Sequence, residues 1–105
     1  MRIIRLALFS LLILPALGHG DELNQRQVEL LAASCANCHG TDGRKAGAVP
    51  PLAGRPADTL EAQLLGFKHD PDTHATVMDR IAQGYTDEQL AALAEHFANL
   101  TAEDE

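Results

Sequence analysis

The stretch "CANCHG", residues 35–40, contains both cysteines of this 105-residue chain, and a histidine directly follows the second cysteine. Two cysteines at this spacing can close a disulfide, act as a redox dithiol, supply half of a metal site or anchor a cofactor. Each of these uses makes its own demand on the rest of the chain. The residues around the stretch therefore discriminate among them.

Three of these uses of Cys35 and Cys38 find little support in the flanking sequence. A dithiol of the thioredoxin kind needs a βαβ pattern around the pair, and the sequence shows no convincing alternating strand. A structural zinc site needs four ligands, but the candidates His69 and His74 lie five residues apart in a proline-containing turn. A disulfide across so short a loop would contribute little to stability.

The pattern Cys-x-x-Cys-His is instead the attachment signature of c-type haem, and it accounts for His39 as well. Cys35 and Cys38 are spaced so that their thiols can add to the two vinyl groups of one haem. The adjacent His39 is then held against the iron as an axial ligand. The sequence therefore predicts one haem c, attached covalently through both cysteines, with His39 on the metal.

Residues 1–18 have the layout of a secretory signal peptide. Two arginines precede an apolar run, a proline breaks that run, and small residues follow it. The apolar run is too short to span a bilayer comfortably, so we expect cleavage after Gly18 or Gly20 and no membrane attachment afterwards. The folded, haem-binding domain would then be residues 19–105. The expected location is the periplasm, because haem of this kind is attached outside the cytoplasm.

Removal of the signal peptide would make the chain strongly acidic. Two arginines and no acidic residue would be lost, which leaves 6 Lys and Arg against 15 Asp and Glu, a formal net charge of −9. Nucleic acid is not an expected partner, because phosphate binding needs a basic surface. The acidic surface suits either solubility alone or steering towards a basic protein. Aromatic residues are scarce, so we expect a non-protein group to fill part of the core.

Apolar residues recur at helical spacing in four segments, which Gly- and Pro-rich loops separate. The first covers residues 24–40, and the second is expected to begin with Asp58 as its N-cap. The third lies around residues 77–83. The last opens at Thr86, where Gln89 completes a capping box. The chain is therefore predicted to be all-α, with four to five short helices and no internal repeat.

Met78 is the candidate for the sixth iron ligand, because the other methionine, Met1, would leave with the signal peptide. A thioether on the haem face opposite His39 would give a relatively high-potential iron suited to electron transfer. Two alternatives stay open. Met78 could be core filler, which would leave an iron suited to gas binding or peroxide chemistry. His69 or His74 could also replace it and give a bis-histidine haem.

Two motifs resemble those of the class I, mitochondrial-type bacterial cytochromes c: "CANCH" at the predicted haem site and "PPLAG" at residues 50–54. The resemblance covers about residues 24–100. It implies the class I fold, in which short helices surround a covalently bound haem and the N- and C-terminal helices cross. It also implies that the carbonyl of Pro50 accepts a hydrogen bond from the haem histidine and thereby fixes it.

The resemblance also implies positions for several apolar residues. In the crossing of the terminal helices, Val28 and Leu31 would pack against Leu93 and Phe97. Part of the haem walls is expected to come from Leu52, Leu64 and Ile81.

The segments "QLLGFK", residues 63–68, and "MDRIAQGY", residues 78–85, are similar to the cytochrome subunits of flavocytochrome c sulfide dehydrogenases. The similarity implies a partner flavoprotein that oxidises sulfide at FAD and passes single electrons to this haem, so that this chain itself does no bond chemistry. The chain departs from those subunits by having one C-x-x-C-H motif, where many have two haem domains, and Thr59, where a tyrosine is common. The alternative is a free-standing soluble cytochrome c that shuttles electrons between redox complexes.

Overall fold

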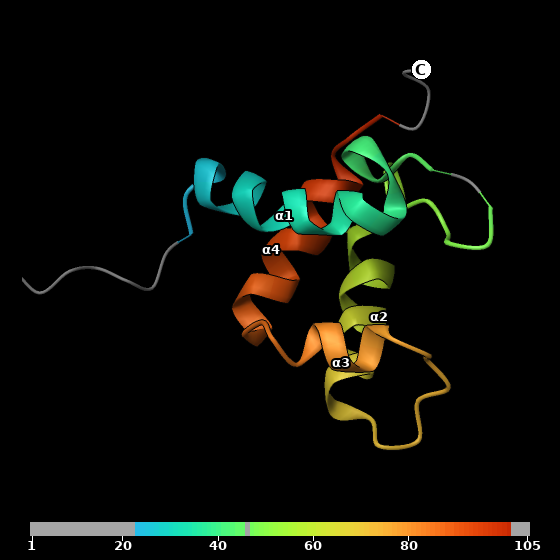
Figure 1. Ribbon diagram of the computed structural model, residues 1–105. Coiled ribbons are helices and arrows are strands. Elements are labelled where there is room, and N and C mark those ends of the chain that lie inside the picture. The colour runs from blue at the N-terminus through green and yellow to red at the C-terminus, as the bar shows by residue number, and fades with distance from the viewer. Residues whose placement is uncertain (1–22, 46, 102–105) are drawn as a thin grey trace, which may run out of the picture.

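The computed structural model describes residues 23–45 and 47–101, and within these ranges it contains helices and no strand. The elements are α1 (Gln25–His39), a 3₁₀ turn η1 (Thr41–Gly43), α2 (Ala57–His69), α3 (Met78–Ala82) and α4 (Asp87–Ala98). In Figure 1, α1 crosses α4, and α2 and α3 lie below the crossing. The predicted all-α fold with crossing terminal helices is confirmed. The predicted signal peptide lies outside the described residues.

Local capping explains where the first and last helices begin. The Asn24 side chain accepts a hydrogen bond from the backbone N–H of Gln27 at 2.9 Å, and the Gln27 side chain accepts one from the backbone N–H of Asn24. Thr86 and Gln89 form the same reciprocal pair at the start of α4, as predicted. Each pair satisfies two N–H groups that would otherwise have no partner.

The predicted cap of α2 is wrong. Pro56 occupies the N-cap position, and Asp58 lies inside the first turn, where its carboxylate accepts a hydrogen bond from the backbone N–H of Thr59 at 2.8 Å. The fixed φ of proline sets the backbone just before the helix without any side-chain cap. Asp58 still lies near the positive end of the helix dipole, where a negative charge is favourable.

The hydrophobic core lies where α4 meets α1 and α2. Leu31 packs against the cluster that includes Leu93 and Phe97, as predicted, whereas Val28 is buried outside that cluster. The buried members of the cluster are Ala32, Leu60, Ala82, Leu90, Leu93, Ala94 and Phe97.

The Gly- and Pro-rich loop after η1 is anchored to α4 by its backbone. The carbonyl of Gly43 accepts hydrogen bonds from the N–H groups of Leu52 and Ala53, at 2.6 and 3.1 Å. The N–H of Gly54 donates to the carbonyl of Phe97 at 2.9 Å. These bonds fix the loop on both sides of Pro50 and so hold its carbonyl in one place.

None of the helices within the described ranges is both long and apolar enough to cross a membrane.

Candidate cofactor site

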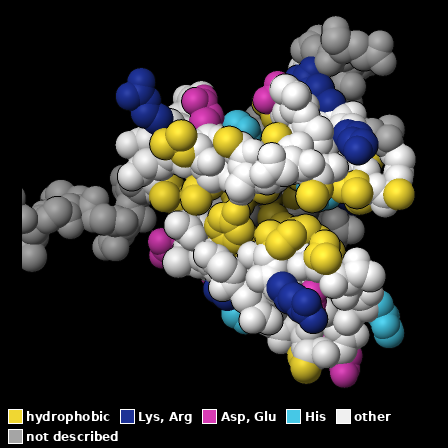
Figure 2. Space-filling view, in the orientation of Figure 1, with side chains coloured by type: hydrophobic (Ala, Val, Ile, Leu, Met, Phe, Trp, Pro, Cys, Tyr) yellow, Lys and Arg dark blue, Asp and Glu magenta, His cyan; other side chains and the backbone are white. Residues whose placement is uncertain are grey.

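A cavity of about 500 Å³ lies among the four α-helices and the loop after η1. Figure 2 shows hydrophobic side chains gathered in this hollow, below α1. Its volume falls in the range of sites that hold organic ligands, roughly 300–1,000 Å³. Leu52, Leu64 and Ile81 all line it. Five further apolar residues of its walls are Leu60, Phe67, Leu93, Ala94 and Phe97.

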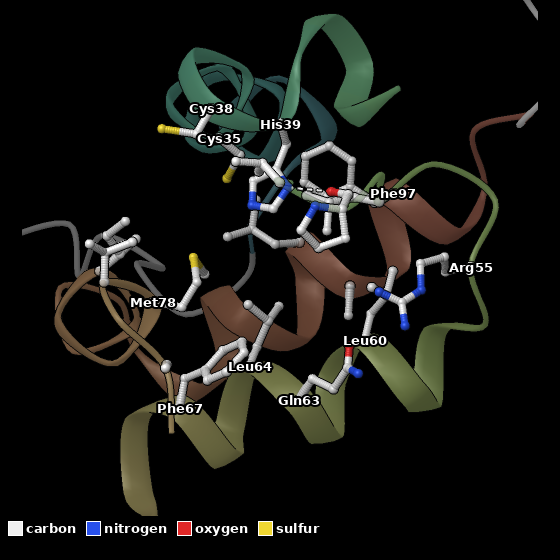
Figure 3. A pocket seen from close by; sticks show the side chains of 18 of the residues that line it. Cys35, Cys38, His39, Arg55, Leu60, Gln63, Leu64, Phe67, Met78 and Phe97 are labelled. Atoms are coloured by element: carbon white, nitrogen blue, oxygen red, sulfur yellow. Dashed lines mark hydrogen bonds between the residues drawn. The ribbon is translucent and has the colours of Figure 1, made fainter. Parts of the chain in front are cut away.

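His39 is the last residue of α1, and its ring points into the cavity (Figure 3). The side chain is 8% exposed, and its Nδ1 lies 2.7 Å from the carbonyl oxygen of Pro50. A carbonyl can only accept a hydrogen bond, so Nδ1 carries the proton and donates it. This tautomer leaves the lone pair of Nε2 free for a metal ion, the arrangement expected of a metal-bound imidazole.

Cys35 and Cys38 lie in the last turns of α1, and both line the cavity beside His39 (Figure 3). Cys35 is half-buried, Cys38 is exposed, and neither is in a disulfide. Burial raises the pKa of the Cys35 thiol above its ordinary value. The pair thus presents two sulfur atoms along one edge of the cavity, as attachment to two vinyl groups requires.

Met78 is the first residue of α3, and its sulfur points into the cavity from the side opposite α1 (Figure 3). Of the two histidines considered as alternatives, His74 lines the cavity. His69 does not, and its Nε2 instead lies 2.8 Å from a carboxylate oxygen of Asp87. The structure therefore brings Met78 and His74, but not His69, to the same cavity as His39.

These residues fit a covalently attached haem. Sulfur atoms for two thioethers lie at one edge, and an imidazole with a free Nε2 lies beside them. A thioether faces the cavity from the other side, and the walls between are mostly apolar. No group of three or more His, Cys, Asp or Glu side chains suited to holding a bare metal ion occurs among residues 23–45 and 47–101.

Sequence reasoning did not identify Arg55, Gln63 or Ser34 as cavity residues. Figure 3 shows Arg55 and Gln63 on the other side of the cavity from Cys38. Gln63 could have been found, because it lies three residues after Leu60 on the face of α2 that lines the cavity. Arg55 directly follows the "PPLAG" motif, which places it on the same loop as Pro50.

Comparison with known proteins identifies the family that this chain resembles. The sequence profile of the cytochrome c family matches residues 27–101. The chain is 44% identical over 73 residues to the cytochrome subunit of sulfide dehydrogenase from Chlorobaculum tepidum. It is 36% identical over 70 residues to cytochrome c-553 from Desulfomicrobium norvegicum, and 42% identical over 72 residues to the thiosulfate dehydrogenase electron acceptor from Stutzerimonas stutzeri.

The three alignments differ in how much of each relative they cover. They take in 70%, 65% and 63% of this chain, in the order given. They span 66% of the sulfide dehydrogenase subunit, 88% of cytochrome c-553 and 32% of the thiosulfate dehydrogenase electron acceptor. The chain thus matches most of one relative and only part of the other two.

Proposed function

Because this chain belongs to the cytochrome c family and carries one covalently attached haem c, we propose that it is the periplasmic haem subunit of a flavoprotein sulfide dehydrogenase. It is an electron carrier that works with a redox partner. In the proposed role it accepts single electrons from the FAD of that partner after sulfide has been oxidised there. The similarity to a sulfide dehydrogenase subunit, at 44% identity, is the observation that carries this proposal.

The residues around the cavity would position the haem and keep water from its iron. Haem iron supplies a one-electron couple between its ferrous and ferric states. Cys35 and Cys38 would anchor the porphyrin covalently, and His39 and Met78 would bind its iron. The apolar walls and the thioether ligand would both favour the less charged ferrous state, and so raise the reduction potential.

An apolar rim beside the cavity supports the role of a subunit over that of a shuttle. Val77 is 55% exposed and Ile81 is 41% exposed, and both line the cavity. Val77 directly precedes Met78, and Ile81 belongs to the same helix, α3. A bound haem would cover the parts that face the cavity, and the remainder would form an apolar rim next to it. Lasting interfaces bury such residues, whereas transient ones have more polar surfaces.

Affinity purification from native periplasm tests this proposal. The tagged cytochrome should retain a flavoprotein that contains FAD and that reduces the haem when sulfide is added. The double variant Val77→Ser with Ile81→Ser should weaken that association roughly tenfold, as loss of a central apolar contact does. Leu30→Ser is the matched control, because Leu30 is 70% exposed and lies outside the cavity. Recovery of the wild-type protein as a monomer free of flavin would contradict the proposal.

The export step has its own test. Mass spectrometry of the native protein should find a mature N-terminus at His19 or Asp21, in the periplasmic fraction. A full-length N-terminus, or recovery in the cytoplasmic fraction, would contradict it.

A free-standing electron carrier is the second candidate function. The observation in its favour is the match to cytochrome c-553, which spans 88% of that relative. Such a carrier would bind its partners weakly, and its electron-transfer rate would fall steeply as salt is added, because charge rather than apolar contact would guide the encounter. A subunit held by the Val77 and Ile81 rim should show little dependence on salt.

A further inference from the structure

A hydrogen bond between Ser34 and Tyr85 links two segments that lie far apart in the sequence. The two side-chain oxygens are 2.7 Å apart, although the residues are separated by 51 positions. Ser34 lies on α1 directly before Cys35 and lines the cavity. Tyr85 lies in the turn between α3 and α4, and its half-buried side chain packs against the core.

The direction of this hydrogen bond follows from a second contact. The Ser34 hydroxyl donates its one proton to the carbonyl of Leu31, at 2.8 Å. The Tyr85 hydroxyl is therefore the donor to Ser34 Oγ. Loss of the Ser34 oxygen would remove this acceptor, and the Tyr85 hydroxyl, at an exposed position, would then bond to water instead of to α1.

The bond joins the two sides of the cavity. Cys35, Cys38 and His39 belong to α1, whereas Met78 begins α3, a helix of five residues with no side-chain cap. Tyr85 is coupled to α3 through its backbone, because its N–H donates to the carbonyl of Ala82 at 3.2 Å. The hydroxyl pair therefore connects the end of the segment that carries Met78 directly to the helix that carries His39.

We propose that Ser34 and Tyr85 are positioning residues, and that their hydrogen bond keeps the Met78 sulfur on the haem iron. This inference rests on the proposed ligation by His39 and Met78. A ligand pair drawn from two separate elements keeps its geometry only if the spacing of those elements is fixed. The main packing of α3 is against α2, and the hydroxyl pair supplies a link from the end of its segment to α1.

Binding of imidazole to the ferric holoprotein measures how often the methionine position opens. Tyr85→Phe removes one oxygen and keeps the ring in the core. It should raise the apparent affinity for imidazole roughly three- to tenfold, the effect of losing one net hydrogen bond. Ser34→Ala should do the same. The double variant should add little to either single change, and Ser34→Thr, which retains a hydroxyl, should restore the wild-type affinity.

A control separates positioning from general stability. Asn24→Ala removes the cap at the far end of α1 and should lower the unfolding temperature without changing the imidazole affinity. If Tyr85→Phe and Ser34→Ala also lower the unfolding temperature but leave the imidazole affinity as in the wild type, the pair is merely structural and the inference is overturned. If the wild-type protein itself binds imidazole as readily as Met78→Ala does, the proposed ligation fails instead.

Discussion

At the scale of single residues, the two ring nitrogens of His39 have different roles: Nδ1 makes a hydrogen bond to the protein, and Nε2 faces the cavity. Nδ1 donates to the Pro50 carbonyl at 2.7 Å, and that hydrogen bond sets both the tautomer and the orientation of the ring. The loop that carries Pro50 is itself tied to Gly43 and to Phe97 by backbone hydrogen bonds. The direction in which Nε2 faces the cavity is therefore determined by the protein before any metal binds.

Replacement of Met78 tests its assignment as a ligand. Met78→Ala should open the sixth position, so that the ferrous protein binds carbon monoxide and the reduction potential falls, because a thioether ligand raises it. His74→Ala is the matched control, since His74 also lines the cavity. Carbon monoxide binding and a redox titration give both quantities. If His74→Ala opens the iron and Met78→Ala does not, the axial ligand has been assigned to the wrong residue.

At Gly43 the structure leaves no room for a side chain. The φ of Gly43 is 68°, and an added Cβ would lie 2.9 Å from Cβ of Leu52 and 3.0 Å from ring atoms of Phe97. Gly43→Ala should therefore lower the free energy of unfolding by about 1–3 kcal/mol, through overpacking and backbone strain. Chemical denaturation of the holoprotein measures this loss.

Gly66 provides the comparison for that experiment. It lies within α2, and an added Cβ would meet no atom within 4 Å. Gly66→Ala should raise stability by about 0.5–1 kcal/mol, since alanine is the better helix former. Equal effects of the two substitutions would contradict the packing described around Gly43.

At the scale of helices and loops, a helix start can be predicted where it depends on residues that are close in the sequence. The capping box at Thr86 needs only a partner three positions away, so the start of α4 could be predicted. The box at Asn24 was not predicted, although it too depends on a partner three positions away. The start of α2 was misplaced because Asp58 has the chemistry of a cap, yet the preceding Pro56 already sets the backbone. No local pattern could show that Gly43 lies against Phe97.

A charged cluster ties α2 to α4 and should respond to pH. Lys68 Nζ and His69 Nε2 each lie 2.8 Å from Oδ1 of Asp87. Hydrogen bonding to Lys68, and then to His69, lowers the pKa of the Asp87 carboxyl below its ordinary value of 3.8. Stability from a lowered carboxyl pKa is complete above the unfolded-state value and is lost as the pH falls through the folded-state value.

The substitution Asp87→Asn should therefore lower the unfolding temperature at neutral pH and leave it unchanged in acid. We expect a small drop in the unfolding temperature at pH 7, because the cluster is exposed to solvent. The difference from the wild type should vanish well below pH 3.8. Glu88→Gln is the matched control, because it removes a carboxylate from the same helical turn without touching the cluster. If the unfolding temperature of Asp87→Asn stays below that of the wild type in strong acid, loss of the carboxylate charge is not the cause.

At the scale of the whole molecule, the site is assembled from distant parts of the chain. The sequence motif and the family resemblance supplied Cys35, Cys38, His39 and Met78, and the structure places all four around one cavity. The Ser34–Tyr85 contact could not be predicted, because it depends on how the segment after α3 meets α1. The position of Arg55 on the cavity wall likewise depends on the path of a loop with no regular pattern.

We propose that His39 and Met78, which lie on opposite sides of one apolar cavity, both bind the iron, and that the site serves electron transfer rather than ligand binding. The most direct test is the absorption spectrum of the reduced wild-type holoprotein, recorded before and after addition of carbon monoxide. Iron bound by both residues should give sharp low-spin bands that carbon monoxide leaves unchanged. A high-spin spectrum, or rapid formation of a carbon monoxide complex, would contradict it.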